Sequence, residues 1–264
     1  MKIKNAAVSG MFYPDRPAQL QQMISDFFAE SSVNLTQEKE SCPRALIVPH
    51  AGLIYSGQVA ANAYSRLEPY MDSIQRVVML GPSHRVPLRT IAAMSAECWR
   101  TPLGDVTLDT DFTDQLLNTG LVSHNDTAHL QEHCLEVQLP FLQILGLDKA
   151  VVPLVVGHVD AQQVAAVINY IFEYPDTLLI ISSDLSHFHS YEEARQIDAE
   201  TDQHILNLNP DLKPEQACGC FAVNGLLLSA AETGLKPRQL SICNSGDTAG
   251  DKQRVVGYAS YVFS

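Results

Sequence analysis

Three short apolar segments of this 264-residue chain each end at histidine or aspartate residues. They are ALIVP (45–49) before His50, RVVML (76–80) before Gly81-Pro82-Ser83-His84, and TLLIIS (177–182) before Asp184 and His187. Runs rich in Val, Ile and Leu with little alternation are typical of strands buried on both faces. Ligands of open α/β sheets bind beyond the carboxyl ends of the strands. The sequence therefore predicts that the four side chains share one pocket.

Imidazole and carboxylate groups bind transition metals and transfer protons near neutral pH. A single histidine after a strand is more often a loop residue that hydrogen-bonds to the backbone. Here three of the nine histidines follow three different strands in the same way. Glycine and proline flank two of them and suit tight loops that direct a side chain. The repeated placement favours a functional cluster.

A second polar cluster lies at residues 126–136, DTAHLQEHCLE, and contains His129, Glu132, His133 and Glu136. On a helix, His129 and His133 would share one face, as would the two glutamates. The order of residues is not the His-Glu-x-x-His of zinc proteases. Two interpretations stay open: a helix start that points into the pocket, and a solvated polar helix start.

A third segment, residues 244–251 (NSGDTAGD), precedes the last predicted strand. Its composition is that of a turn. Asp247 or Asp251 could also supply a carboxylate ligand, and the preceding Cys243 a thiolate.

Composition restricts the class of protein. Hydrophobic residues make up 46% of the chain and charged residues 18%, which permits a sizeable core. The formal net charge of −13 repels phosphate backbones, so nucleic acid is not an expected partner. The six cysteines show no regular framework, which favours reduced thiols. We find no signal peptide and no apolar stretch of about 18 residues, so we expect a cytoplasmic protein without a membrane span.

Predicted strands alternate with predicted helices along the chain, which indicates an α/β fold with a mostly parallel sheet and helices on both faces. Further strands are predicted at 150–156 and 254–263, and a strand pair with a turn at 99–104 is predicted within 91–108. Helices are predicted at 17–30, 57–66, 111–118, 135–145, 161–173, 191–206 and 222–233. The polar stretch 31–43 is interpreted as a surface connection, so residues 1–264 form a single predicted domain.

Several motifs together resemble the Memo family over essentially the whole chain. In order, they are Gly10-Met11-Phe12-Tyr13-Pro14, Val48-Pro49-His50-Ala51-Gly52 with Tyr55-Ser56-Gly57, Gly81-Pro82-Ser83-His84, Glu132-His133-Cys134-Leu135-Glu136, Ser182-Ser183-Asp184-Leu185-Ser186-His187, Cys218-Gly219, and Ser245-Gly246-Asp247 with Val255-Val256-Gly257-Tyr258-Ala259. Each motif alone is weakly specific, but their shared order is strongly specific. Bacterial and archaeal members, of the AmmeMemoRadiSam system protein B type, often look like partners of a radical-SAM protein.

The Memo family is similar in fold to the class III extradiol ring-cleavage dioxygenases. Those enzymes hold a non-haem Fe(II) with two histidines and one carboxylate. The resemblance implies that His50 and His84 are metal ligands and that His187 is an acid/base residue. It further implies that Asp184 orients His187 or helps to hold the pocket together, and that His133 faces the substrate.

The third ligand departs from the family pattern. A cysteine fills this place in animal Memo proteins, and its position falls on Thr248 here. The adjacent Asp247 would restore a two-histidine, one-carboxylate set, and Asp251 and Cys243 are the other candidates. Fe(II) is the expected metal, with copper and zinc as alternatives.

The resemblance thus implies an iron- or copper-dependent oxidoreductase, similar to a dioxygenase, that acts on an unidentified small substrate. A non-catalytic metal- or peptide-binding scaffold that partners a radical-SAM system is the alternative. A metal-dependent hydrolase is a lesser third hypothesis.

Overall fold

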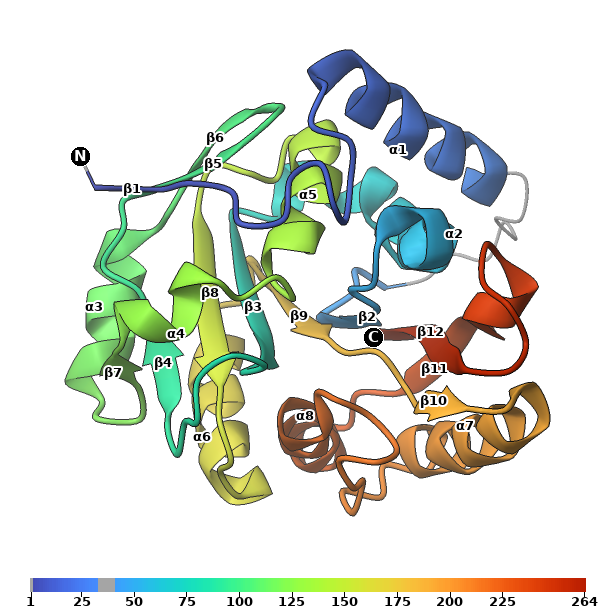
Figure 1. Cartoon of the computed structure of the whole chain (residues 1–264). Helices are drawn as coiled ribbons and strands as arrows, with labels where there is room; N and C mark the ends of the chain where they lie inside the picture. Colours follow the sequence, from blue (N-terminus) through green and yellow to red (C-terminus); the bar gives the residue numbers. More distant parts are fainter. Residues whose placement is uncertain (1, 33–40) are drawn as a thin grey trace.

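The computed structural model describes residues 2–32 and 41–264 of the chain, so most of the expected connection at 31–43 lies outside the described residues. Within these residues the main sheet has nine strands in the order β10-β12-β2-β9-β3-β8-β4-β7, with β11 paired to β12. A separate sheet has the order β1-β5-β6. Figure 1 shows helices on both faces of the main sheet, which confirms the α/β class.

The four central strands are parallel to one another. They are β2 (Ala45–Val48), β9 (Thr177–Ser182), β3 (Arg76–Pro82) and β8 (Val151–Val156). The outer pairings are different, because β12 (Val255–Phe263) runs antiparallel to β2, and β4 (Ile91–Ala93) antiparallel to β8. The expected parallel sheet is therefore the centre of a mixed sheet whose flanks are antiparallel.

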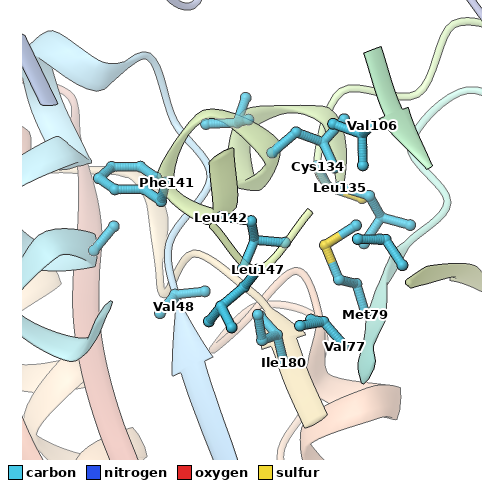
Figure 2. Close-up of a cluster of buried hydrophobic side chains, with 14 of the residues drawn as sticks. Val48, Val77, Met79, Val106, Cys134, Leu135, Phe141, Leu142, Leu147 and Ile180 are labelled. Atoms are coloured by element: carbon cyan, nitrogen blue, oxygen red, sulfur yellow. The ribbon is translucent and has the colours of Figure 1, made fainter. Parts of the chain in front are cut away.

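Alternate residues of each central strand enter two different hydrophobic clusters, because successive side chains of a strand point to opposite faces. In β2, Leu46 and Val48 belong to the cluster that includes α1, α2 and α5. Ala45 and Ile47 belong to the cluster that includes α3, α6, α7 and α8. Figure 2 shows part of the first cluster, to which Phe141 and Leu142 of α5 and Met79 and Ile180 of the sheet belong. Burial on both faces explains why these strands lack polar alternation.

The helices of the described residues are α1 (Pro17–Ser32), α2 (Leu53–Tyr64), α3 (Thr110–Asn118), α4 (Asp126–Leu130), α5 (Leu139–Leu145), α6 (Ala161–Phe172), α7 (Tyr191–Leu206) and α8 (Cys220–Thr233). Short 3₁₀ segments are η1 (Ser65–Ser73), η2 (Glu136–Gln138) and η3 (Ser245–Asp247). The helix expected at 135–145 is divided into η2 and α5. Pro140 lies in the first turn of α5, the place where its missing N–H costs least.

The strand pair expected within 91–108 is present as β5 (Cys98–Thr101) and β6 (Gly104–Thr107), whereas β4 joins the main sheet. The expected turn at 99–104 is wrong at its start. Trp99 is buried in β5 opposite Val106, so the turn is confined to residues 102–103.

Besides β4, four further strands were not expected: β1 (Ile3–Lys4), β7 (Ser123–His124), β10 (His187–His189) and β11 (Pro237–Asn244). Three are too short to show a pattern, and β11 is half-buried along most of its length, without an apolar run. No helix in the described part of the chain is long and apolar enough to cross a bilayer.

Candidate metal centre

Strands β2, β9 and β3 are parallel neighbours. The polar residues that follow these strands therefore lie at the same edge of the sheet, as the sequence predicts. His50 follows β2 and His84 follows β3, and their ring centroids lie 5.3 Å apart. A third imidazole, His133, lies 4.7 Å from His84 and 5.4 Å from His50. One ring nitrogen from each of the three lies within 4.8 Å of the others. The structure thus brings together three imidazoles from distant parts of the chain.

The segment that carries His133 is not helical. Helix α4 ends at Leu130, and residues 131–135 then cross over the end of β3. A Cβ on Gly81 would lie 2.7 Å from the sulfur of Cys134, so only glycine permits this close crossing. His129 and His133 therefore do not share a helix face. His129 instead contacts the carbonyl of Ala92 at 2.9 Å, buried away from the other three.

Hydrogen bonds fix which nitrogen of His50 carries a proton. The Ser182 hydroxyl donates its one hydrogen to the carbonyl oxygen of Cys134, at 2.7 Å. Its oxygen can therefore only accept from Nδ1 of His50, which lies 2.9 Å away. His50 thus carries its hydrogen on Nδ1 and presents a lone pair on Nε2.

A longer chain of hydrogen bonds supports Ser182. Gln138 donates from Nε2 to both Ser182 Oγ and the carbonyl of Pro49, each at 2.9 Å. That carbonyl can only accept, so the amide orientation of Gln138 is determined. Its oxygen accepts from the hydroxyl of Tyr64 in α2, at 2.9 Å. A polar path thus runs from Tyr64 to His50 through the core.

Glu132 holds His84 in a similar way. Its carboxylate accepts from Nδ1 of His84 at 2.8 Å and from the backbone N–H of His84 at 2.6 Å. It also accepts from the backbone N–H groups of His133 and Cys134. A carboxylate only accepts, so Nδ1 of His84 carries a hydrogen, and in the neutral ring Nε2 presents a lone pair. Nδ1 of His133 lies 3.2 Å from Glu132 but makes no aligned hydrogen bond there.

The protonation of this cluster follows from burial and charge. Burial, with the neighbouring His84 and His133, lowers the pKa of His50 well below its ordinary value. Burial alone would raise the pKa of Glu132, but its contacts with His133 and His84 outweigh burial and hold that pKa well below its usual range. A neutral His50 beside an ionised Glu132 suits a metal ion, because imidazole ligands bind metals in the neutral form.

Asp184 and His187 lie beside the three imidazoles. Asp184 is buried and accepts the backbone N–H of His50 at 2.7 Å, so it fixes the loop that carries this ring. Burial raises the pKa of Asp184, and the hydrogen bond from His50 opposes the effect. Nδ1 of His187 lies 2.8 Å from the carbonyl of Leu185, which can only accept, so Nδ1 carries a hydrogen and Nε2 is the nitrogen without one in the neutral ring.

Cys218, just before α8, also reaches the cluster. Its sulfur lies 3.3 Å from Nε2 of His50 and 3.3 Å from the backbone nitrogen of Asp184. Burial raises the pKa of this thiol. The close approach depends on Gly219, where a Cβ would lie 2.7 Å from the Cβ of Ser183.

The structure does not bring Asp247 to the histidines. Asp247 is exposed in η3, and its carboxylate accepts from the Tyr191 hydroxyl at 2.6 Å and from the backbone N–H of Asn244 at 3.0 Å. Asp251 caps the backbone of Gln253, and Cys243 lies in the β11–β12 pairing. His133, and none of these three residues, is the third member of the group formed with His50 and His84.

The N-terminal motif closes one side of the cluster. The ring of Phe12 lies 4.6 Å from that of His133. Glu136 is fully buried and accepts from the Tyr13 hydroxyl and from the backbone N–H groups of Ala7 and Val8. Of the two glutamates, Glu132 supports the imidazoles and Glu136 anchors the N-terminal segment beside them.

Four supporting residues escaped the sequence-based prediction of the site: Glu132, Gln138, Ser182 and Cys218. Glu132 was in the polar cluster and Cys218 in a family motif, so both had a signal. Ser182 also stands in a family motif, at the start of Ser182-Ser183-Asp184. Gln138 had no signal, because its role depends on contacts between distant segments.

The donor set fits a metal ion. Metal-binding histidines almost always donate their second ring N–H to a carboxylate or another acceptor, and His50 and His84 both do so. Imidazole nitrogens suit zinc, copper and iron. The trio His84, Glu132 and Cys134 is also close together, but Glu132 is occupied by N–H groups and burial raises the pKa of the Cys134 thiol. His50, His84 and His133 are the better ligands.

Comparisons with known proteins agree with these motifs. The sequence model described as Memo-like protein matches residues 4–262. A MEMO1 family protein of Aquifex aeolicus is 33% identical over an alignment of 275 residues that covers 100% of both chains. A MEMO1 family protein of Methanocaldococcus jannaschii is 35% identical over 287 residues, with 99% of each chain covered.

Among solved structures, an uncharacterized protein of Escherichia coli K12 has the same fold. It has a TM-score of 0.51 at 13% identity and covers 83% of this chain and 99% of its own. At this identity the likeness concerns the fold alone. The family match and the relatives extend over nearly every residue, including the motifs that build the histidine cluster. The chain belongs to the Memo family.

Proposed function

We propose that this protein is a metal-dependent oxidoreductase that acts on a small substrate, with the metal held by His50, His84 and His133. The observation that carries the proposal is the pair of lone pairs on Nε2 of His50 and His84, each fixed by an acceptor behind the ring. When bound, an ion such as Fe(II) supplies Lewis-acid and redox chemistry. Three protein ligands leave further positions open for a substrate.

The residues around the imidazoles have distinct parts in this proposal. His187 can accept a proton at Nε2, since Nδ1 carries the hydrogen. Asp184 positions the loop of His50 through its backbone N–H. Phe12 covers one face of His133 and excludes water from that side. A radical-SAM partner stays a prediction from the family resemblance.

A metal-dependent hydrolase is the second candidate. Three histidines with an open position are also the ligand set of some catalytic zinc sites, in which a bound water becomes acidic. The two functions differ in the metal and in the co-substrate.

The test compares protein loaded with Fe(II) and with Zn²⁺. We expect stoichiometric O₂ uptake by the Fe(II) form with at least one compound from a panel of catechols and other small phenols. Loss of that uptake in His187→Gln, with the iron retained, would support the role of His187. Full iron loading without any uptake would reject the oxidoreductase. Turnover of esters or amides by the Zn²⁺ form would then support the hydrolase, and inactivity of both forms would support the scaffold.

A further inference from the structure

A cavity of about 580 Å³ lies next to the metal centre. Its walls are the loop that follows β3, the end of β8 with residues 157–158, and the start of α8. The volume falls within the range of sites that bind small molecules.

The walls are held together by backbone hydrogen bonds. The N–H of Gly157 donates to the carbonyl of Thr90 at 3.0 Å, and that of His158 to the carbonyl of Leu88 at 2.7 Å. A Cβ on Gly157 would lie 2.3 Å from the carbonyl oxygen of Leu88, so the two segments touch at their backbones. The cavity is therefore preformed.

The lining combines an apolar surface with two nitrogen-bearing side chains. Leu88, Val156 and Phe221 supply the apolar part, and Arg89 and His158 the polar part. The ring of His158 packs edge-on against Phe221, with centroids 4.7 Å apart. The cavity can thus bind a ligand that has an apolar body next to a hydrogen-bond acceptor.

The charge of the cavity opposes that of the protein. The chain has 30 acidic residues and a formal net charge of −13, yet the lining contains neither aspartate nor glutamate. Within the described residues, Arg89 has no hydrogen bond or ion pair. An unpaired guanidinium in an otherwise acidic protein is available for an anion from outside. Its planar fork matches a carboxylate.

The cavity also reaches the metal centre. Cys218 lines it, and the sulfur of Cys218 lies 3.3 Å from Nε2 of His50. Ser83 lines it too and directly precedes His84. A molecule whose acid group lies at Arg89 would therefore extend toward the imidazoles.

We propose that this cavity binds small organic acids, with the carboxylate paired to Arg89 and an aromatic or aliphatic body on Leu88, Val156 and Phe221. That such an acid is the substrate rests on the proposed function. Binding of the acid itself does not require the metal.

The test uses 4-fluorobenzoate as the probe and ¹⁹F NMR line broadening as the measurement, on the metal-free and Zn²⁺-loaded protein. We expect a dissociation constant on the order of 1 mM in both forms. The neutral 4-fluorobenzamide has the same ring without the charge, and it should bind about tenfold more weakly.

Arg89→Gln should weaken benzoate binding about tenfold and leave benzamide binding unchanged. Arg85→Gln is the matched control, since Arg85 lies on the same loop but outside the cavity lining. Equal binding of acid and amide, or an equal loss in both variants, would overturn the proposal. If the protein binds 4-fluorobenzoate but takes up no metal, the metal centre is rejected and the organic-acid site is supported. If it takes up metal but does not bind 4-fluorobenzoate, the organic-acid site is rejected and the metal centre is supported.

Discussion

Replacing Ser182 with alanine tests the hydrogen bonds behind His50. The hydroxyl of Ser182 is fully buried, donates to the carbonyl of Cys134 and accepts from Nδ1 of His50 and Nε2 of Gln138. In Ser182→Ala, Gln138 keeps its bond to Pro49, but the His50 N–H and the Cys134 carbonyl each lose the partner described above. An unsatisfied buried polar group costs about 1–3 kcal/mol. The free energy of unfolding should thus fall by about 2–6 kcal/mol.

Metal affinity should fall as well. Without an acceptor at Nδ1, the hydrogen of His50 is no longer confined to that nitrogen, and a hydrogen on Nε2 competes with the metal. Loss of such an acceptor typically lowers metal affinity 10–100-fold, which corresponds to about 1.4–2.7 kcal/mol. Tyr64→Phe removes only the far end of the hydrogen-bond chain and should weaken binding less than threefold, on the order of 0.6 kcal/mol.

The assay is a competition titration of Zn²⁺ against a chromophoric chelator, at a temperature where circular dichroism shows each variant to be folded. Ser260→Ala is the matched control, because Ser260 is equally buried in β12 and its hydroxyl has no hydrogen-bond partner among the residues that the structure describes. Wild-type affinity in folded Ser182→Ala would refute the reasoning about the tautomer of His50. An equal loss of affinity in Ser260→Ala would show that the effect is not specific to this chain of hydrogen bonds.

Two further predictions concern other buried groups. The Glu132 carboxylate accepts four N–H hydrogen bonds, and in Glu132→Gln the amide NH₂ must face some of these donors. The free energy of unfolding, measured with urea, should fall by about 3 kcal/mol or more. Titration with Zn²⁺ should show that metal binding is lost. Glu132→Asp keeps the charge and should retain part of the stability and part of the Zn²⁺ binding. Burial lowers the pKa of His129 to about 4. Since an unfolded histidine titrates near 6.5, the unfolded state binds a proton that the native state lacks, and stability should decrease as the pH falls from about 6.5 to 4, by about 3 kcal/mol in total. Urea unfolding at pH 7 and pH 4.5 should show a smaller decrease in His129→Gln, and equal decreases in both proteins would contradict the assignment.

The centre of the fold could be predicted because its strands are buried on both faces and leave continuous apolar runs. The expected strands at 45–49, 76–80 and 177–182 correspond to β2, β3 and β9. Their parallel pairing is what brings His50 and His84 together. The antiparallel edges could not be predicted, since β11 is half-buried and β10 has only three residues.

The position of His133, the third candidate ligand, depends on where the preceding helix ends. His133 lies in the polar cluster, but a helix through this cluster would have paired it with His129. The helix stops at Leu130, and in the irregular segment after it Cys134 and Leu135 pack against Gly81. Asp247 had the right chemistry in the right motif, but its carboxylate is occupied by Tyr191 and the backbone of Asn244. Such contacts between distant segments leave no pattern along the sequence.

Metal content tests the histidine centre most directly. The protein would be purified anaerobically without a metal-binding tag, and Fe, Cu and Zn would be quantified by elemental mass spectrometry beside His50→Ala, His133→Ala and Asp247→Ala. We predict about one equivalent of metal in the wild type and in Asp247→Ala, and none in the two histidine variants. Metal lost from Asp247→Ala but retained by His133→Ala would contradict the three-histidine centre.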